Sequence, residues 1–340
     1  MSTQKQSISL AKIANLTLAQ WLPIDSTSHE TLITFDKVQQ SFALLKNSSS
    51  PHTTSTELVI FADMTLSTFA ALLSHCEISL KCLSKINQRN NAVSYRFNVQ
   101  VEDLMQARNR LAAFNIAEKV ESALLVNAPS LSQPGLLVMD MDSTTIKIEC
   151  IDEIAALAGV GEEVAAVTEQ AMLGQLDFGQ SLHQRVAKLS NAPENILAQV
   201  ALNIPLMEGL EVLVKALKEH NWRVAIASGG FTYFAEHLQH MLSLDAAFAN
   251  VLEISQQRLT GKVLGNIIDA QAKADCLLQL QEEFNIAATQ TVAMGDGAND
   301  LVMMAAAHLG VAFHAKPLVL AQADACITTS GLDCLLHWLK

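Results

Sequence analysis

The sequence predicts an α/β fold, in which a doubly wound parallel sheet carries an inserted helical segment and follows a small α+β domain. Short apolar runs recur from residue 136 onward, and each is followed by a polar corner and a helical pattern. Buried parallel strands joined by helices have this character. About 85 residues between the first two runs show helical spacing without a strand candidate, whereas residues 1–130 mix alternating and helical stretches.

The N-terminal part, residues 1–130, is predicted to form the α+β domain. Alternating aromatic and β-branched residues over 93–101 predict a strand, and apolar residues at helical spacing over 102–114 predict a helix. Further strands are expected at 58–62 and 121–127. No chemical motif stands out in this part, so its role stays open.

The second predicted domain covers residues 131–340 and begins at a Pro-Gly turn. The first three of its apolar runs end in Asp140, Ser228 and Asp296. Because the carboxyl ends of parallel strands meet at one edge of a sheet, we expect these side chains to line one crevice. The strands of this sheet are expected at 136–140, 224–228, 291–296, 310–313 and 325–328.

A helical insertion over about residues 150–205 follows the first strand of this domain. Such an insertion would lie over the crevice at the strand ends as a cap. Residues 251–263 alternate and turn, which predicts a small hairpin. The four helices of the cap are expected at 151–158, 162–172, 178–189 and 193–202.

The net charge of −12 comes from the second domain, since residues 1–130 carry 10 acidic and 11 basic side chains. Acidic chains bind nucleic acid and anionic membranes poorly, because both need basic surface. The sequence has no signal-like apolar region and no run of about eighteen apolar residues, and its six cysteines form no C-x-x-C pair. We therefore expect a cytoplasmic protein with neither nucleic acid nor membrane as partner.

Two acidic motifs end strands of the predicted sheet. Asp140 and Asp142 are spaced so that they repel unless a cation or a donor compensates, which suits a nucleophile beside a proton donor. Asp296 and Asp300 would reach the same edge, where carboxylates and a substrate phosphate suit Mg²⁺. Taken separately, the first motif also fits a solvated turn or a D-x-D glycosyltransferase, and the second fits a glycine-rich turn.

Four further polar features could complete an anion site. Ser228 and the two glycines after it offer a hydroxyl and backbone N–H groups, although such a sequence is more often a plain turn. Lys273 could supply a fixed cation beside the aspartates, although most lysines are solvated. Glu149 and Arg185 in the cap fit either a surface ion pair or a substrate clamp, in which the arginine binds a carboxylate.

These residues lie in segments that closely resemble the phosphoserine phosphatases of the haloacid dehalogenase superfamily over about residues 136–340. The segments are DMDSTTIKIECIDEIAALAG, AMLGQLDFGQSLHQRV, SGGF, the region of Lys273 and GDGANDLVMMAAAHLGVAFHAKP. The resemblance implies a Rossmann-like core with a helical cap. It also implies Mg²⁺-dependent hydrolysis of O-phospho-L-serine, the last step of serine biosynthesis, through an aspartyl-phosphate.

Carried over by motif, the resemblance implies that Asp140 is the nucleophile and Asp142 the general acid and base. Mg²⁺ would be bound by the Asp140 carboxylate, the Asp142 backbone carbonyl and Asp296. The phosphoryl oxygens would be bound by Ser228, Gly229 and Lys273, with help from Asn299.

The remaining carried-over roles surround this centre. Asp300 would orient Lys273 or a metal-bound water, and Thr144 and Gly230 would support the site. Glu149 would bind the serine ammonium and Arg185 its carboxylate, while Met172 and Phe178 would form an apolar lid. Some family members carry an ACT-like domain at the N-terminus, with which the α+β pattern is compatible, and a homodimer is a candidate assembly.

Three alternatives stay open from the sequence. The nearest is a phosphatase of the same superfamily for another small phosphomonoester, against which the opposite charges of Glu149 and Arg185 argue. A D-x-D glycosyltransferase would leave Asp296 and Lys273 without a role. A regulatory protein that senses an amino acid through residues 1–130 would need an idle core, although every expected catalytic position is filled.

Overall fold

The computed structural model describes residues 6–22, 31–45, 54–173 and 175–340. The chain divides into two compact units. Unit 1 consists of residues 1–130 together with 314–340, and unit 2 consists of residues 131–313. The division after residue 130 coincides with the predicted boundary, but the structure groups the last 27 residues with unit 1, whereas the sequence analysis assigned them to the second domain.

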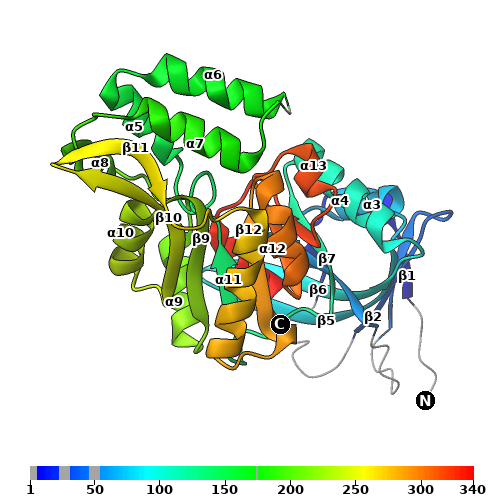
Figure 1. Cartoon of the computed structure of the whole chain (residues 1–340). Coiled ribbons are helices and arrows are strands. Elements are labelled where there is room, and N and C mark those ends of the chain that lie inside the picture. The colour runs from blue at the N-terminus through cyan, green and yellow to red at the C-terminus, as the bar shows by residue number, and fades with distance from the viewer. Residues whose placement is uncertain (1–5, 23–30, 46–53, 174) are drawn as a thin grey trace. The chain divides into compact units, whose positions relative to one another are not determined.

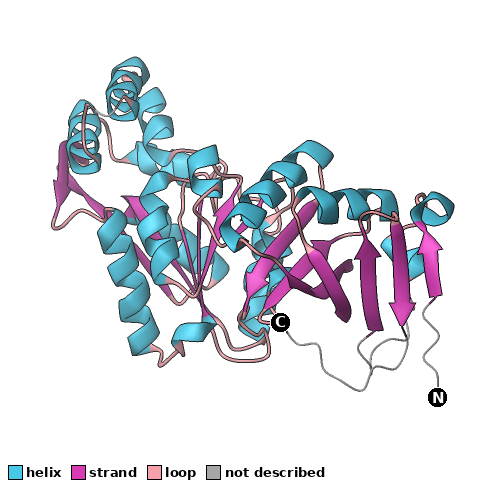
Figure 2. Ribbon diagram, turned by 90° about the vertical axis from the view of Figure 1, so that its right-hand side faces the viewer, coloured by secondary structure: helices cyan, strands magenta, loops and turns pink. Residues whose placement is uncertain are grey.

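Unit 1 contains a seven-stranded antiparallel sheet of order β1-β3-β2-β5-β6-β4-β7. The helices α3 and α4 lie on one face of this sheet (Figures 1 and 2). The strands β4, β6 and β7 and the helix α4 fall where the sequence predicted them. The sheet strands are β1 (Gln6–Ser9), β2 (Thr31–Asp36), β3 (Ser41–Leu45), β4 (Thr56–Phe61), β5 (Ser79–Arg89), β6 (Ala92–Gln100) and β7 (Glu121–Val126). The helices of this part are α1 (Leu10–Ile13), α2 (Leu18–Trp21), α3 (Leu66–His75) and α4 (Leu104–Glu118).

Aromatic rings fill the core between this sheet and its helices. Phe42 of β3 stacks on Phe69 of α3 with ring centroids 5.9 Å apart, and Phe69 also contacts Phe97 of β6 at 5.0 Å. All three side chains are fully buried. Burial of this apolar surface is the main source of stability for the unit.

The last segment of the chain is bound to unit 1 by buried charged groups. Arg96 of β6 donates from Nη2 to the carbonyl oxygens of His337, Trp338 and Leu339 at 2.9–3.1 Å, and from Nη1 to Glu57 at 3.0 Å. These bonds satisfy carbonyl groups at a helix C-terminus, which otherwise lack partners. They explain why the segment groups with unit 1. Its elements are α13 (Pro317–Leu320), β14 (Ala325–Ile327), the 3-10 helix η3 (Leu332–Cys334) and α14 (Leu335–Trp338).

A second acidic residue of unit 1 holds the same segment. Glu121, the first residue of β7, accepts hydrogen bonds from the backbone N–H groups of Thr328, Thr329 and Ser330, each at 2.9 Å. It also accepts from both threonine hydroxyl groups. These five donors satisfy the oxygens of a carboxylate that is removed from water.

The sheet of unit 2 runs β11-β10-β9-β8-β12-β13. Its strands are parallel except β11, which is antiparallel to β10. Helices α9 to α12 flank this sheet (Figure 1), so the predicted α/β fold class is confirmed. The strands are β8 (Leu136–Met139), β9 (Arg223–Phe231), β10 (Ala246–Ser255), β11 (Arg258–Leu264), β12 (Thr291–Gly295) and β13 (Leu309–Phe313). The helices are α9 (Leu210–Glu219), α10 (Thr232–Leu242), α11 (Ala270–Glu283) and α12 (Leu301–Ala306), with the 3-10 helices η1 (Ala288–Gln290) and η2 (Ala298–Asp300).

The cap consists of four helices between β8 and β9, gathered at one end of the unit 2 sheet (Figure 1). The β10–β11 hairpin is hydrogen-bonded to the cap. The Asn191 N–H donates to the Leu259 carbonyl at 2.8 Å, and the Leu259 N–H donates to the Ala192 carbonyl at 2.9 Å. No helix among the described residues is long and apolar enough to cross a membrane. The cap helices are α5 (Cys150–Ala158), α6 (Gly161–Met172), α7 (Phe178–Lys188) and α8 (Asn195–Ala201).

Candidate active site

A buried lysine joins two carboxylates at the carboxyl edge of the unit 2 sheet. Asp140 follows β8, Asp300 ends η2, and Lys273 lies in the first turn of α11. The Lys273 Nζ lies 2.8 Å from Asp140 Oδ1 and 2.7 Å from Asp300 Oδ1. Burial alone would lower the pKa of Lys273, but these two carboxylates raise it above its ordinary value. The lysine is therefore a fixed cation at this edge.

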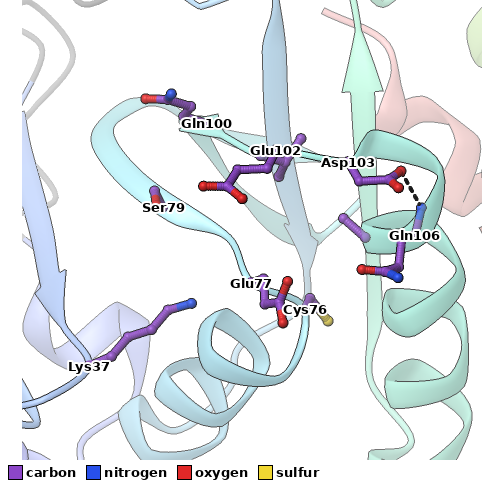
Figure 3. Close-up of a pocket in the computed structure, with 10 residues that line it drawn as sticks. Lys37, Cys76, Glu77, Ser79, Gln100, Glu102, Asp103 and Gln106 are labelled. Atoms are coloured by element: carbon purple, nitrogen blue, oxygen red, sulfur yellow. Dashed lines mark hydrogen bonds between the residues drawn. The ribbon is translucent and has the colours of Figure 1, made fainter.

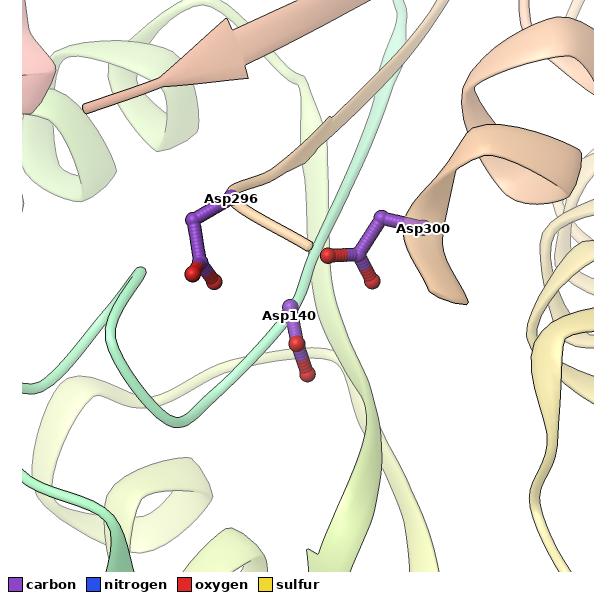
Figure 4. Close-up of side chains that lie close together, drawn as sticks. All are labelled: Asp140, Asp296 and Asp300. Carbon is purple, nitrogen blue, oxygen red and sulfur yellow. The ribbon is translucent and has the colours of Figure 1, made fainter. Parts of the chain in front are cut away.

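Three carboxylates at this edge come within reach of one metal ion. One ligand oxygen from each of Asp140, Asp296 and Asp300 lies within 4.8 Å of the others, and Figure 4 shows the three side chains together. Asp296 follows β12 and accepts a 3.2 Å hydrogen bond from the buried Thr144 hydroxyl. Burial, and then the charge of Asp140, raise the pKa of Asp296. A cluster of hard oxygen donors in which negative charge accumulates suits a divalent cation.

Asp142 lies between the cap and the strand β9. Its Oδ1 accepts a hydrogen bond from the N–H of Cys150, the first residue of α5, at 3.2 Å. A Cβ added at Gly230 would lie 2.8 Å from Asp142 Oδ2, so only glycine permits this approach. Burial, and then the negative charges of Glu149 and Asp140, raise the pKa of Asp142 to about 8. A carboxyl group with this pKa is protonated at neutral pH and can donate a proton.

The loop between Asp142 and the cap has an unusual backbone. Ser143 has a φ of 58°, in the left-handed region that non-glycine residues seldom adopt. This conformation allows the Ser143 hydroxyl to donate to Glu149 Oε1 at 2.7 Å. Desolvation, and the nearby Asp296 and Asp140, raise the pKa of Glu149. Backbone strain of this kind persists where the surroundings impose it, often at functional sites.

The strand β9 does not end at Ser228 as expected but continues through both glycines to Phe231. The buried Ser228 Oγ accepts a hydrogen bond from the Gly230 N–H at 2.9 Å. A Cβ added at Gly229 would lie 2.6 Å from Cζ of Phe178, the first residue of α7, so the cap ring lies directly on this glycine. The structure thus places an apolar cap residue over the predicted anion-binding segment.

The cap also supplies a partly desolvated cation. Arg185 of α7 is half-buried, and its Nε has no hydrogen-bond partner among the described residues. Burial lowers the pKa of Arg185, whereas Asp152, Glu149 and Asp142 raise it. A guanidinium with an unused buried donor suits a planar carboxylate ligand.

Two predicted residues contribute less to this geometry. Met172 ends α6, and its side chain lies outside the described residues. Asn299 of η2 is half-buried, with its side-chain oxygen against Gly297. The structure places its backbone directly before Asp300 in η2.

Residues 135–308 match the family model of the haloacid dehalogenase-like hydrolases, and this stretch contains every predicted site residue. The chain belongs to the haloacid dehalogenase-like hydrolases. The resemblance seen in the sequence is thereby confirmed at the level of the superfamily, and the protein is a hydrolase of this family.

Three known proteins show how far this likeness to other haloacid dehalogenase-like hydrolases extends. The phosphoserine phosphatase of Vibrio cholerae is 58% identical over 216 residues, which cover 64% of this chain and 66% of that protein. The crystal structure of a probable phosphoserine phosphatase from Vibrio cholerae matches with a TM-score of 0.72 and 45% identity, covering 83% of this chain and 86% of that one. A phosphoserine phosphatase structure with an analogue of the phospho-aspartyl intermediate matches with a TM-score of 0.58 and 40% identity, covering 61% of this chain and 100% of that one.

One buried polar residue near the site of this hydrolase was not predicted. Asn250 of β10 donates to the Gly229 carbonyl at 2.8 Å and accepts from the Ile268 N–H at 2.9 Å. It lies just before the segment predicted as a hairpin. The available signal was a lone amide in the otherwise apolar run Ala-Ala-Phe-Ala-Asn-Val-Leu.

Unit 1 of this hydrolase contains a separate surface concavity of about 370 Å³ (Figure 3). Its lining is mostly polar and includes Lys37, Glu77 and Glu102. Glu77 forms an ion pair with Arg110 at 2.6 Å, and its pKa is lowered by that hydrogen bond and charge. No residue of the predicted site lines this concavity.

Proposed function

We propose that the chain is a phosphoserine phosphatase, which hydrolyses O-phospho-L-serine to L-serine and phosphate in the last step of serine biosynthesis. Support comes from the relatives and solved structures of that name, one of which carries a phospho-aspartyl analogue. The carboxylate edge of unit 2 and its charged cap fit this reaction. A cytoplasmic location and a homodimer stay predictions.

The observation that carries the choice of substrate is the partly desolvated guanidinium of Arg185. Its Nε lacks a partner among the described residues, and Glu149 is near enough to raise its pKa. A substrate with a carboxylate and an ammonium would satisfy both cap groups at once. The phosphoryl group would then face Lys273 and Asp140. Phosphoserine combines these three charged groups in one small molecule.

Asp140 is the proposed nucleophile. Its Oδ1 is bound by Lys273 Nζ at 2.8 Å and by the Met141 N–H at 2.7 Å, which leaves the other oxygen to attack phosphorus. Lys273 reduces the repulsion between this carboxylate and the phosphoryl group. The P–O bond to serine breaks as the Asp140–phosphorus bond forms. The resulting aspartyl-phosphate divides one slow hydrolysis into two faster steps.

Asp142 is the proposed acid and base. With its pKa raised to about 8, it is protonated at neutral pH and can donate its proton to the departing serine oxygen. As a carboxylate it then takes a proton from the water that attacks the aspartyl-phosphate. This step releases phosphate and regenerates Asp140. The cap would exclude water until serine has left.

The carboxylate and carbonyl oxygens at the carboxyl edge of the unit 2 sheet fit Mg²⁺. The proposed ligands are the carboxylates of Asp140 and Asp296 and the backbone carbonyl of Asp142, and the ion would neutralise charge on the phosphoryl group. Asp300 is close enough to be a ligand, but its oxygens already bind Lys273 Nζ and the Gly297 N–H at 3.0 Å. We therefore assign Asp300 to orienting Lys273.

The phosphoryl oxygens are expected between Ser228 and Lys273. The Ser228 Oγ accepts from the Gly230 N–H, which leaves its own O–H free to donate to the phosphoryl group. The Gly229 N–H and the side chain of Asn299 would add donors. Phe178 and Met172 would close the apolar side of the pocket.

The proposal is tested by Arg185→Ala, assayed with O-phospho-L-serine and with p-nitrophenyl phosphate. Loss of a charge-assisted hydrogen bond costs about 2–3 kcal/mol, so kcat/KM for phosphoserine should fall roughly 30- to 150-fold. p-Nitrophenyl phosphate has no carboxylate and should be affected far less. Lys188→Ala, on the same helix and paired with Glu163 at 3.2 Å, is the matched control and should leave both rates unchanged. Equal losses on both substrates would remove Arg185 from carboxylate binding.

A substrate panel run with Mg²⁺ and with EDTA tests the reaction itself. We expect phosphoserine to be hydrolysed faster than other small phosphomonoesters, and EDTA to abolish this activity until Mg²⁺ is restored. Preference for a phosphomonoester without an amino-acid group would favour the alternative substrate class of the same superfamily. Activity that survives EDTA would contradict the metal assignment.

A further inference from the structure

Asn250 is a buried amide on the strand beside the predicted phosphate-binding segment. It is 1% exposed and lies on β10, which pairs in parallel with β9. The register shifts between Phe248, which pairs with Ala227, and Asn250, which pairs with Phe231. A bulge of this kind changes the direction in which a side chain points. Here the Asn250 side chain points toward the backbone groups of Gly229 and Ile268.

Both functional groups of this amide form hydrogen bonds to the backbone. Nδ2 donates to the Gly229 carbonyl at 2.8 Å, and Oδ1 accepts from the Ile268 N–H at 2.9 Å. A carbonyl can only accept and an N–H can only donate, so the orientation of the amide is determined by its partners. The two backbones also approach directly, because a Cβ at Gly229 would lie 3.7 Å from the Ile268 carbonyl oxygen.

The two partners belong to different halves of the proposed phosphate site. Gly229 follows Ser228 on β9, whereas Ile268 precedes Asp269, the residue that caps α11 by accepting from the Ala272 N–H at 2.9 Å. Lys273 lies one turn into that helix. The donors expected on one side of the phosphoryl group therefore come from β9, and the cation on the other side comes from α11.

We propose that Asn250 is a positioning residue for phosphoryl binding, which holds the Ser228–Gly230 segment at a set distance from the helix of Lys273. The inference rests on the proposed phosphatase function of the same site. A shift of Gly229 would move its N–H and the Ser228 hydroxyl away from the phosphoryl oxygens.

Two variants separate the two hydrogen bonds. Asn250→Asp keeps the acceptor for Ile268 but places an oxygen against the Gly229 carbonyl, and Asn250→Leu removes both bonds at similar volume. Displacement of reacting groups by about 1 Å costs on the order of 100-fold in rate, and loss of a residue that orients a site costs roughly 10- to 100-fold. We expect both variants to lose kcat/KM within that range.

Product inhibition gives a readout that a general loss of packing would not produce. The inhibition constant of inorganic phosphate should rise roughly tenfold or more in both variants, because its donors are displaced. The inhibition constant of L-serine, which depends on Glu149 and Arg185, should change by less than about threefold. Equal weakening of both products, or no weakening of phosphate, would overturn the proposal.

Asn115 offers a matched control in the other unit. It is also fully buried, and its amide donates to the Ser122 carbonyl at 2.8 Å and accepts from the Ser122 hydroxyl at 2.6 Å. Asn115→Asp should lower the unfolding midpoint but leave both inhibition constants unchanged. If neither Asn250 variant folds under conditions where Asn115→Asp does, Asn250 serves folding and the proposal fails.

Assays of the parent protein distinguish the proposed function from the proposed role of Asn250. Hydrolysis of phosphoserine by the full-length, Mg²⁺-loaded protein tests the proposed function. The ratio of kcat/KM between variant and parent is measured with whichever phosphomonoester the parent hydrolyses, together with the inhibition constant of phosphate. The role of Asn250 is therefore tested even if phosphoserine proves to be the wrong substrate.

Discussion

In unit 1 the buried guanidinium of Arg96 faces one carboxylate and three carbonyl oxygens, whereas in unit 2 the buried Lys273 faces two carboxylates that stand beside a third. In the first arrangement the carboxylate is paired twice, because Glu57 also contacts Lys340 at 3.3 Å, and among the described residues only the Arg96 Nε is left without a hydrogen-bond partner in this group. The second has more negative than positive charge. Burial alone therefore does not mark a functional site, since both units bury charged groups.

The excess of negative charge in unit 2 changes the pKa values of its acidic side chains. Burial and mutual repulsion raise the pKa of Asp142, Asp296 and Asp300, which is the pattern expected where a cation and a phosphate are to bind. In unit 1, Glu121 instead meets five donors from the last segment of the chain. Buried charge in unit 1 thus holds the chain together, whereas in unit 2 we propose that it binds a ligand.

Asp140→Asn should give the largest effect. The variant keeps the shape of the side chain but removes the proposed nucleophile, so phosphoserine turnover should fall at least about a thousandfold. Because the substitution also removes a carboxylate from an overcrowded edge, the free energy of unfolding should not decrease. Initial rates and urea unfolding of the same preparation provide the two measurements.

Asp275→Asn is the matched control for that experiment. Asp275 lies on the same helix as Lys273, is exposed, and accepts a hydrogen bond from Gln271 at 2.8 Å. Its substitution should leave turnover near that of the parent. Normal turnover in Asp140→Asn would remove Asp140 from the nucleophile role, and a clear loss of stability would show that the unit 2 charges are balanced after all.

Arg96→Met should give the opposite result in unit 1. Removing one partner of a buried ion pair costs about 3–5 kcal/mol, because the other charge stays buried without compensation, and here the last helix also loses three carbonyl partners. The unfolding of unit 1 can be followed by the fluorescence of Trp338, which is buried in the last segment. We expect its midpoint to fall steeply.

Arg110→Met is the control for Arg96→Met, since the Arg110–Glu77 pair is largely exposed and such pairs contribute about 0–1 kcal/mol. Similar losses of stability in both variants would mean that the Arg96 cluster contributes no more than a surface pair. The clearest support would be a midpoint change in Arg96→Met several times larger than in Arg110→Met.

The contrast also explains what could be predicted from the sequence. Asp140, Ser228 and Asp296 each end an apolar run, and parallel strands bring such ends together, so a local pattern was enough to predict their proximity. The attachment of the last segment to unit 1 could not be predicted in this way. Arg96 and the carbonyl groups it binds are separated by 241–243 residues, and no periodicity links them.

The missed residues have a related explanation. Asn250 acts through a register shift in β10, which depends on the pairing of that strand with β9 and not on its own pattern. The strand β9 was predicted to end at Ser228, because glycines usually break strands, yet it continues to Phe231. Side-chain and backbone contacts across the sheet decided both features.

The smallest effect is expected from the buried His337. Its Nδ1 lies 2.9 Å from the Ser94 hydroxyl, and burial, with the charges of Arg89 and Arg96, lowers its pKa to about 4. The imidazole is therefore neutral in the folded unit, while in the unfolded chain it takes up a proton near its ordinary pKa of 6.5. The stability that depends on the neutral form is present above pH 6.5 and is lost as the pH falls toward 4, by roughly 3 kcal/mol.

His337→Gln should abolish most of that pH dependence. Urea unfolding of the parent and the variant, followed by Trp338 fluorescence between pH 4 and 7, isolates the contribution of this one group, because all other titrating groups are shared. His75→Gln, at an exposed position of unit 1, should retain the slope of the parent. If stability depends on pH equally in His337→Gln and in the parent, the surroundings of Arg96 tolerate an additional positive charge. The charged groups of unit 1 would then not be closed to further charge, in contrast to what the comparison with unit 2 predicts.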